Sequence, residues 1–444
     1  MVDINKYKDW ILLISICCSL VTLWVDVPGL DLLFLLPLCY GVCLRLLVPD
    51  NAQVNAGLLI LFLVLSFRYL LYPILLFIAY EPIPNVQHYG QEAICYMLVE
   101  ILAIFLTIYH TCKANTVSFS LLEEHKVNYH MLLILFIVSM GFVALGNDMM
   151  EGKHFVWETD AIIEEVTYKN SGVASQVFAW FQAFFMMYFV NYFAQKYWDS
   201  NRNVFYVLSV LICFMPCLLY SGHSRLSLLI PLVASCALIY KVYGSKSKIA
   251  ISTSLIVGGC VLILLSVVKS FRSTEGMADA DDLFVAPMIN AYFEGIENVI
   301  VGLRAYEHFG INTSWLIWDS LSNAMGISGY FEFSPGTSKA FNEVLYGGAG
   351  LAYDQIVPTI ASGMMYFGQF LFFIPTVVMT YVVCKCDAIF ARTKSIEYAY
   401  LYSNFPIIVA WAVPGSWMHL TGRFFNFYLP ILFLIFLNNR ISKR

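Results

Sequence analysis

The chain has 444 residues, of which 60% are hydrophobic and 12% are charged, and its mean hydropathy is +0.72. A soluble domain is roughly 45–50% apolar, so the surplus predicts helices that face lipid. No polar block is long enough to form a soluble domain, which excludes a chain built from such domains. The net charge of −5 matters less than its distribution, because the charges gather between apolar runs.

Crossing the hydrocarbon of a bilayer takes about 20 mostly apolar residues. The first apolar run follows Lys6 and Lys8 without a small-residue cleavage site, so it is expected to remain as a span and not to be a cleaved signal peptide. The expected fold class is all-α, a polytopic membrane helical bundle of about twelve transmembrane helices. The predicted spans cover residues 10–25, 30–47, 56–80, 93–111, 130–146, 174–195, 203–220, 225–243, 249–268, 360–384, 398–415 and 424–439.

The basic residues predict the orientation of these spans. With the N-terminus in the cytoplasm, most of the 25 lysines and arginines fall in inside segments, and the short outside segments 26–29 and 81–92 have none. This positive-inside pattern alternates along the whole chain, so both termini are expected to be cytoplasmic. The 12 cysteines lie in apolar runs or at their inner ends, which argues against a disulfide framework.

One long segment interrupts the pattern of spans. It divides the chain into helices 1–9 over residues 1–268, a long periplasmic loop over residues 269–359, and helices 10–12 over residues 360–444. Within the loop, apolar residues recur at helical spacing, which predicts an amphipathic helix near 287–306, at the interface or packed on the bundle. These apolar residues are Ile289, Tyr292, Phe293, Ile296, Val299, Ile300 and Leu303.

Two charges fall inside predicted spans. Arg68 lies near the middle of the third span, and Glu100 lies in the fourth, about one turn nearer the outside. Charges at such depth are costly unless they are paired. The first interpretation is a structural Arg68–Glu100 ion pair, and the second is a site that faces a substrate cavity.

Several arginines lie on the outer side, where positive charge is scarce. Arg225 opens a span, Arg272 follows one, Arg423 opens the last, and Arg304 belongs to the loop helix. Arginine binds phosphate oxygens through two parallel N–H bonds, so a convergent set would suit a lipid-linked pyrophosphate. Each arginine alone could instead extend to lipid headgroups.

The outer side also holds candidates for a general base. His223, His308 and His419 all lie there, and His419 precedes Arg423 by four residues, which places the two on one face of a helix. Asp354 and Glu297 are further candidates. No nucleotide-binding loop, serine triad order or zinc spacing is present.

Two short motifs resemble those of a known family. Ser221-Gly222-His223-Ser224-Arg225-Leu226-Ser227-Leu228-Leu229 resembles the Gly-x-x-Arg start of a span in Wzy-type O-antigen and oligosaccharide-repeat-unit polymerases. Gly347-Gly348-Ala349-Gly350-Leu351-Ala352, leading to Pro358-Thr359 and Gly363, is similar to the Gly-rich stretch that closes the long periplasmic loop in that family. The number of spans, the late loop and the termini agree with this layout.

The resemblance implies a metal-independent, lipid-linked glycosyltransferase without a cofactor, in the bacterial inner membrane. Such an enzyme polymerises undecaprenyl-pyrophosphate-linked repeat units into a surface polysaccharide. The implied partners are the lipid-linked oligosaccharide, membrane lipid and a chain-length regulator protein, and no nucleic acid. The expected catalytic residues are Arg225, Arg272, His223, His308, Asp354 and Glu297, and the expected substrate-binding residues are Arg225, Arg272, Arg304, Arg423 and His419.

Three other classes remain open at this point, and one of them is an acyltransferase, although the sequence shows no clear His-Asp motif at the membrane edge. A multipass transporter or a flippase of lipid-linked oligosaccharide would show broken helices with ionisable residues at mid-membrane. A non-enzymatic accessory or length-control protein would not need arginines at outer helix ends.

Overall fold

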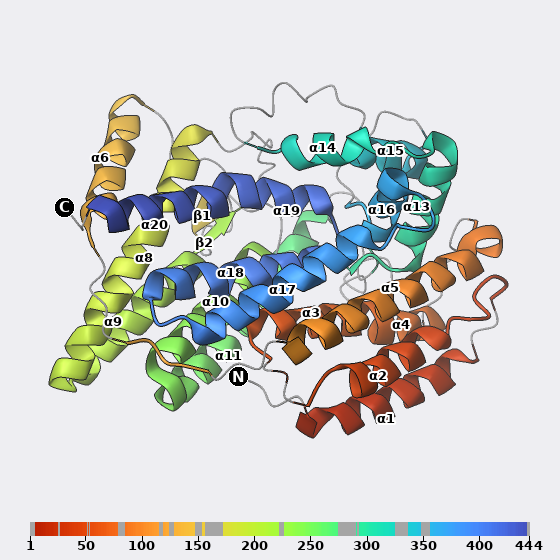
Figure 1. Ribbon diagram of the computed structural model, residues 1–444, viewed down its shortest axis with the longest axis horizontal. Helices are drawn as coiled ribbons and strands as arrows, with labels where there is room; N and C mark the ends of the chain where they lie inside the picture. The colour runs from red at the N-terminus through yellow and green to blue at the C-terminus, as the bar shows by residue number, and fades with distance from the viewer. Residues whose placement is uncertain are drawn as a thin grey trace. The chain divides into compact units, whose positions relative to one another are not determined.

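The computed structural model is helical nearly throughout the residues it describes (Figure 1). It describes residues 1–444 apart from 1–4, 25–26, 51, 53, 79–84, 115–118, 124–127, 147–152, 156–171, 222–225, 274–289, 291–292, 325–335, 348–355 and 442–444. The chain forms two compact units, and each is built from separate stretches of sequence. Unit 1 comprises Met1–Val117, Asp281–Ala388 and Pro406–Gly422, and unit 2 comprises Ser118–Ala280, Ile389–Phe405 and Arg423–Arg444.

Unit 1 combines the first helices of the chain with the helices of the predicted loop. Its early helices are α1 (Asn5–Thr22), α2 (Leu35–Leu47), α3 (Ala56–Ser66), the π-helical turn η1 (Phe67–Leu71), α4 (Tyr72–Ile78) and α5 (Val86–Ala114). Its later helices are α13 (Ile296–Phe309), α14 (Ser314–Leu321), α15 (Gly336–Leu345), α16 (Thr359–Phe367), most of α17 (Ile374–Arg392), the second half of α18 (Ile396–Ala412), and α19 (Trp417–Arg423) up to Gly422.

Unit 2 contains the middle of the chain and its C-terminal helix. Its elements are α6 (His130–Ala144), β1 (Lys153–Phe155), α8 (Val173–Ser200), α9 (Asn203–Phe214), η2 (Met215–Leu218), β2 (Leu219–Ser221), α10 (Leu226–Tyr243), η3 (Gly244–Ser247), α11 (Lys248–Ser273), the π-helical turn η7 (Phe424–Tyr428) and α20 (Leu429–Ile441). The two short strands pair antiparallel, with Lys153 opposite Ser221. This ribbon is the exception to an otherwise helical fold among the described residues.

Six helical segments among the described residues are long and apolar enough to cross a membrane. They are Ala56–Ile78, Val86–Ala114, Val173–Ser200, Leu228–Val261, Ile374–Arg392 and Leu420–Ile441. The all-α class and the transmembrane character predicted from the sequence are therefore confirmed. Leu35–Leu47, His130–Ala144 and Asn203–Leu218 are apolar but shorter, so the number of twelve spans stays a prediction.

The loop helix predicted near 287–306 is present in part, as α13 (Ile296–Phe309), and the predicted residues Ile289 and Tyr292 lie outside the described residues. Ile296, Val299 and Ile300 are fully buried, and Leu303 is nearly so, because α13 packs against α5, α15 and α16 (Figure 1). The contact with α16 is close, since a Cβ added at Gly302 would lie 2.3 Å from the Cβ of Ala361. The apolar face of this helix thus belongs to the core of unit 1.

The single span predicted over residues 360–384 is wrong. The structure has two helices there, α16 and α17. α16 ends at Phe367 and is followed by Gly368, whose φ of +80° belongs to the left-handed region that favours glycine. Every residue from Thr359 to Tyr366 is buried. An apolar run alone does not distinguish a buried helix of this kind from the start of a membrane span.

The break also explains why residue 363 is a glycine. A Cβ at Gly363 would lie 1.9 Å from the carbonyl oxygen of Phe372, which is far inside van der Waals contact. We expect Gly363→Ala to lower the free energy of unfolding by roughly 1–3 kcal/mol, as overpacking does. Thermal unfolding in detergent measures the loss. Gly141→Ala in α6 is the control, because a Cβ there meets nothing within 4 Å, and equal losses in both variants would contradict the explanation.

A buried carboxylate joins two of the three sequence stretches of unit 1. Asp387 of α17 is 2% exposed and accepts hydrogen bonds from the backbone N–H groups of Gly57 (3.1 Å) and Leu58 (2.9 Å) in the first turn of α3. These N–H groups have no partner within α3 itself. Asp387 therefore caps α3 from another helix.

Candidate functional site

The two mid-span charges form an ion pair. Arg68 Nη2 lies 3.2 Å from Glu100 Oε2, and both side chains are 0% exposed. The ion pair expected from the sequence is therefore present. Both residues belong to segments apolar enough to cross a membrane, where charged side chains are rare and commonly functional.

Local backbone geometry positions Arg68. It lies in η1, the π-helical turn between α3 and α4, and such turns occur preferentially at functional sites. Arg68 Nη1 donates to the carbonyl oxygen of Pro414 at 3.3 Å. The guanidinium is thus held between a carboxylate of α5 and the backbone that follows α18.

Glu100 receives two further hydrogen bonds. The hydroxyl of Tyr69 donates to Oε2 at 2.5 Å, and the hydroxyl of Thr376 in α17 donates to Oε1 at 3.3 Å. Because both oxygens accept bonds, Glu100 is well satisfied as an anion. Its place in the site is fixed from three helical elements.

A second carboxyl group, that of Glu294, interacts with this pair. Glu294 precedes α13, is 1% exposed, and has a φ of +54°, a strained value for a non-glycine residue. Its Oε2 accepts a bond of 2.8 Å from Asn298 Nδ2, and Asn298 is held in turn by Asn290 at 3.0 Å. Burial raises the pKa of Glu294 well above its ordinary value, although the Asn298 amide and the charge of Arg68 oppose the shift.

Three polar atoms of this cluster lack hydrogen-bond partners. Among the described residues, Arg68 Nε, Arg68 Nη2 and Glu294 Oε1 make no hydrogen bond, although Arg68 Nη2 is ion-paired with Glu100. Leaving a buried polar group unpaired costs about 1–3 kcal/mol, and more for a charged group. The combination of Arg68, Glu100, Glu294 and Asn298, defined here as the Arg68 site, is therefore the strongest candidate functional site among the described residues.

The structure brings few of the sequence-predicted site residues together. Arg225, His223 and Asp354 lie outside the described residues, and Arg272 and His419 are placed only as backbone within α11 and α19. Arg304 and His308 lie toward the end of α13, with Arg304 half-buried and His308 exposed, whereas Arg423 is exposed and belongs to unit 2.

Glu297 is the predicted residue that borders the Arg68 site. It lies in the first turn of α13, is half-buried, and accepts a hydrogen bond from Asn290 Nδ2 at 3.2 Å. Glu294, three residues earlier, was not selected from the sequence. In the sequence, Glu294 could have been noticed as an acid followed by a glycine, directly before the apolar positions of α13. Its interaction with Arg68 could not have been noticed, because the two residues are more than 200 positions apart.

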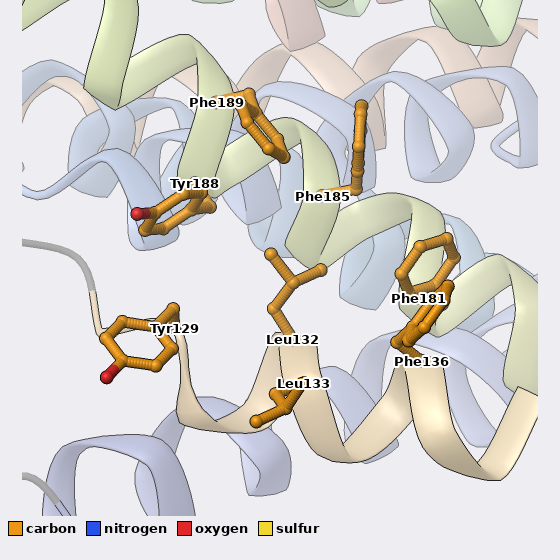
Figure 2. Close-up of a pocket in the computed structure, with 8 residues that line it drawn as sticks. All are labelled: Tyr129, Leu132, Leu133, Phe136, Phe181, Phe185, Tyr188 and Phe189. Carbon is orange, nitrogen blue, oxygen red and sulfur yellow. The ribbon is translucent and has the colours of Figure 1, made fainter.

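A second feature, in unit 2, is an apolar groove of 380 Å³ between α6 and α8. Figure 2 shows aromatic side chains of both helices directed toward it, without a charged group. Its lining residues are Tyr129, Leu132, Leu133, Phe136, Phe181, Phe185, Tyr188 and Phe189. Such a surface suits hydrocarbon, and the hydroxyls of its two tyrosines are the polar side-chain groups in its lining.

The apolar helices and the intramembrane ion pair define the chain as a helical membrane protein. No protein-family model, curated protein or solved structure matches it. Among the described residues, no three His, Cys, Asp or Glu side chains gather as metal ligands would.

Proposed function

We propose that the protein polymerises undecaprenyl-pyrophosphate-linked oligosaccharide repeat units into a surface polysaccharide, such as an O-antigen or capsule. The observation that carries the proposal is the position of the predicted loop. Its helices α13, α14 and α15 pack into unit 1, and the segment before α13 contributes Glu294 to the neighbourhood of Arg68. A membrane enzyme that acts on a lipid-linked glycan needs polar groups of this kind beside apolar helices.

The proposed reaction is metal-independent glycosyl transfer. A hydroxyl of the acceptor repeat unit attacks the anomeric carbon of the donor glycan, and the bond between that carbon and the pyrophosphate oxygen breaks. The lipid pyrophosphate leaves with the electron pair, and a carboxylate or histidine takes the proton of the hydroxyl. Arg225, with Arg272, Arg304 and Arg423, is proposed to stabilise the departing pyrophosphate.

The proposed location is the bacterial inner membrane, with twelve spans and both termini in the cytoplasm. The positive-inside distribution of lysine and arginine supports this orientation. The reaction then takes place at the outer face, where the repeat units are presented. A chain-length regulator is the proposed protein partner.

A flippase or transporter of lipid-linked oligosaccharide is the second candidate. Three observations favour it: the break between α16 and α17 at Gly368, the π-helical turn η1, and the buried Arg68–Glu100 pair. Discontinuous helices with ionisable groups in the membrane are typical of transporters.

One reconstitution experiment separates the two candidates. Purified protein in vesicles receives lipid-linked repeat units, and the reaction is followed by glycan length on a gel and by the exposure of labelled repeat units on each leaflet. The polymerase proposal expects longer glycans without a cofactor. Movement of repeat units between leaflets, with no lengthening, would replace it with the flippase.

A further inference from the structure

The exposed face of α14 is apolar. Its buried face carries Trp315, which packs in an apolar cluster with Phe341 of α15 and Tyr366 of α16. On the other side of the helix, Ile317 is 61% exposed. Asp319 is the one charged residue of α14, and it is buried. The exposed face therefore has no charge to keep it in water.

The neighbouring helix α15 has an exposed face of the opposite kind. It packs beside α14 on the same apolar cluster (Figure 1), and its exposed residues Lys339 and Glu343 are one helical turn apart. Charged side chains such as these require water, whereas an exposed isoleucine without a charged neighbour on its own face suits hydrocarbon. The two helices are thus suited to different surroundings.

The start of α17 sets the depth of one end of α14. α17 is long and apolar enough to cross a membrane, and it begins at Ile374. The turn directly before it exposes Phe370, at 90%, and Leu371. Because consecutive Cα atoms are about 3.8 Å apart, both residues lie close to the level at which α17 enters the membrane. The exposed side of α17 is itself apolar, with Val378 and Tyr381, so the turn comes directly before a surface that faces lipid.

Ile311 joins this turn to α14. It is exposed, and its Cδ1 would lie 2.9 Å from a Cβ added at Gly368, where the turn begins. The backbone N–H of the next residue, Asn312, donates to the carbonyl oxygen of Met365 at 2.7 Å. The residues directly before α14 therefore lie at the same depth as the start of α17.

The other end of α14 lies beside the start of a second apolar segment, Leu420–Ile441, which is also long enough to cross a membrane. The hydroxyl of Thr421 donates to the carbonyl oxygen of Asp319 at 3.3 Å. A Cβ added at Gly422 would lie 2.8 Å from the Cβ of Asn323. Because α14 contacts the starts of both segments, both starts are on one side of the membrane, and α14 lies at that surface.

We propose that α14 is an interfacial helix, and that it and the turn before α17 insert apolar side chains among the acyl chains of phospholipids. The leaflet is the one that the distribution of lysine and arginine predicts to be the outer one. The inserted side chains, defined here as the α14 patch, are Ile311, Ile317, Phe370 and Leu371.

The α14 patch gives the interfacial role to a different helix from the one that the apolar spacing near 287–306 indicated. The apolar face of α13 is buried in unit 1, so it is not available to lipid. Insertion of the α14 patch holds the core that α14 shares with α13, α15 and α16 at the membrane surface, and the inference does not depend on which reaction the protein performs.

The test places the photoreactive residue p-benzoylphenylalanine at Phe370 or at Ile317. The full-length protein is reconstituted in vesicles of phosphatidylethanolamine and phosphatidylglycerol and irradiated, and mass spectrometry identifies what has been attached. The matched controls carry the same residue at Lys339 or Glu343 on α15. The patch positions are expected to give roughly 10-fold more lipid adduct than the controls, because burial of a large apolar side chain in hydrocarbon is favoured over water by at least that factor.

A cryo-electron microscopy map of the wild type in a lipid nanodisc is the second readout, and it needs no substitution. Lipid density at the level of α14 and Phe370 supports the inference. The inference is overturned if the patch positions give no more lipid adduct than the α15 positions, or if they attach to a second copy of the chain instead of lipid. A map in which α14 stands clear of the lipid density would overturn it as well.

Discussion

Replacing Arg68 with methionine should lower the free energy of unfolding by about 3–5 kcal/mol, which is the cost of leaving one member of a buried ion pair uncompensated. Glu100 would then carry a charge at 0% exposure, with only the hydroxyls of Tyr69 and Thr376 as donors. Methionine keeps an unbranched apolar stem and carries no charge, so the change removes the guanidinium and limits the loss of apolar packing. The change in the free energy of unfolding is measured by unfolding the purified protein in mixed micelles.

Two further variants make this result specific. Arg45→Met breaks an ion pair with Asp9 that is largely exposed, at 42% and 78%, and should cost less than about 1 kcal/mol. Adding Glu100→Gln to Arg68→Met removes the uncompensated charge and keeps an acceptor for Tyr69, so the double variant should be more stable than Arg68→Met alone. A double variant that is less stable would show that packing, and not charge, governs the site.

The Arg68–Glu100 pair was predictable because both residues interrupt apolar runs, and a bilayer tolerates such charges only in pairs. The same reasoning could not find Glu294. Its environment depends on how residues 281–388 fold back onto the first helices, and hydropathy carries no information about that long-range contact. Its near neighbour Glu297 was selected instead, one turn further along the same segment.

Periodicity succeeded at α13 and failed at α16 for a physical reason. Apolar residues three and four apart specify a helix face whatever covers it, so Ile296, Val299 and Ile300 were identified correctly. The length of an apolar run is a different kind of signal. Residues 360–384 are long enough to cross a bilayer, but the left-handed turn at Gly368 divides them into two helices. A glycine in an apolar run does not by itself indicate that a helix ends there.

Arg225→Ala should reduce polymer formation by about 10²–10³-fold, which is typical for loss of one charge-assisted contact in a water-poor site. Arg225 lies outside the described residues. It stands at the outer start of a predicted span, where positive charge is scarce, and the pyrophosphate of a lipid carrier is held at that depth by its own tail. A guanidinium there can bind two phosphate oxygens at once.

The matched variant for this prediction is Arg225→Lys. A lysine keeps the charge but cannot make the forked contact, so it should restore little of the lost rate. Both variants must remain folded and inserted in the membrane, as judged by gel filtration in detergent. The test compares the length of the glycans that each purified variant and the wild type make from lipid-linked repeat units. Full activity of Arg225→Ala at normal expression would refute the role of this residue.

The bond from Asp387 to the start of α3 has a consequence for biosynthesis. The two N–H groups of α3 receive their partner only after another 330 residues have been made, which takes roughly 20–60 s at ordinary translation rates. During that interval α3 lacks this cap, while much of unit 2 is synthesised. A ribosome that stops before Asp387 therefore releases a chain in which two N–H groups at the start of α3 have no carboxylate partner, and this difference gives membrane proteases a structural basis for distinguishing it from the finished protein.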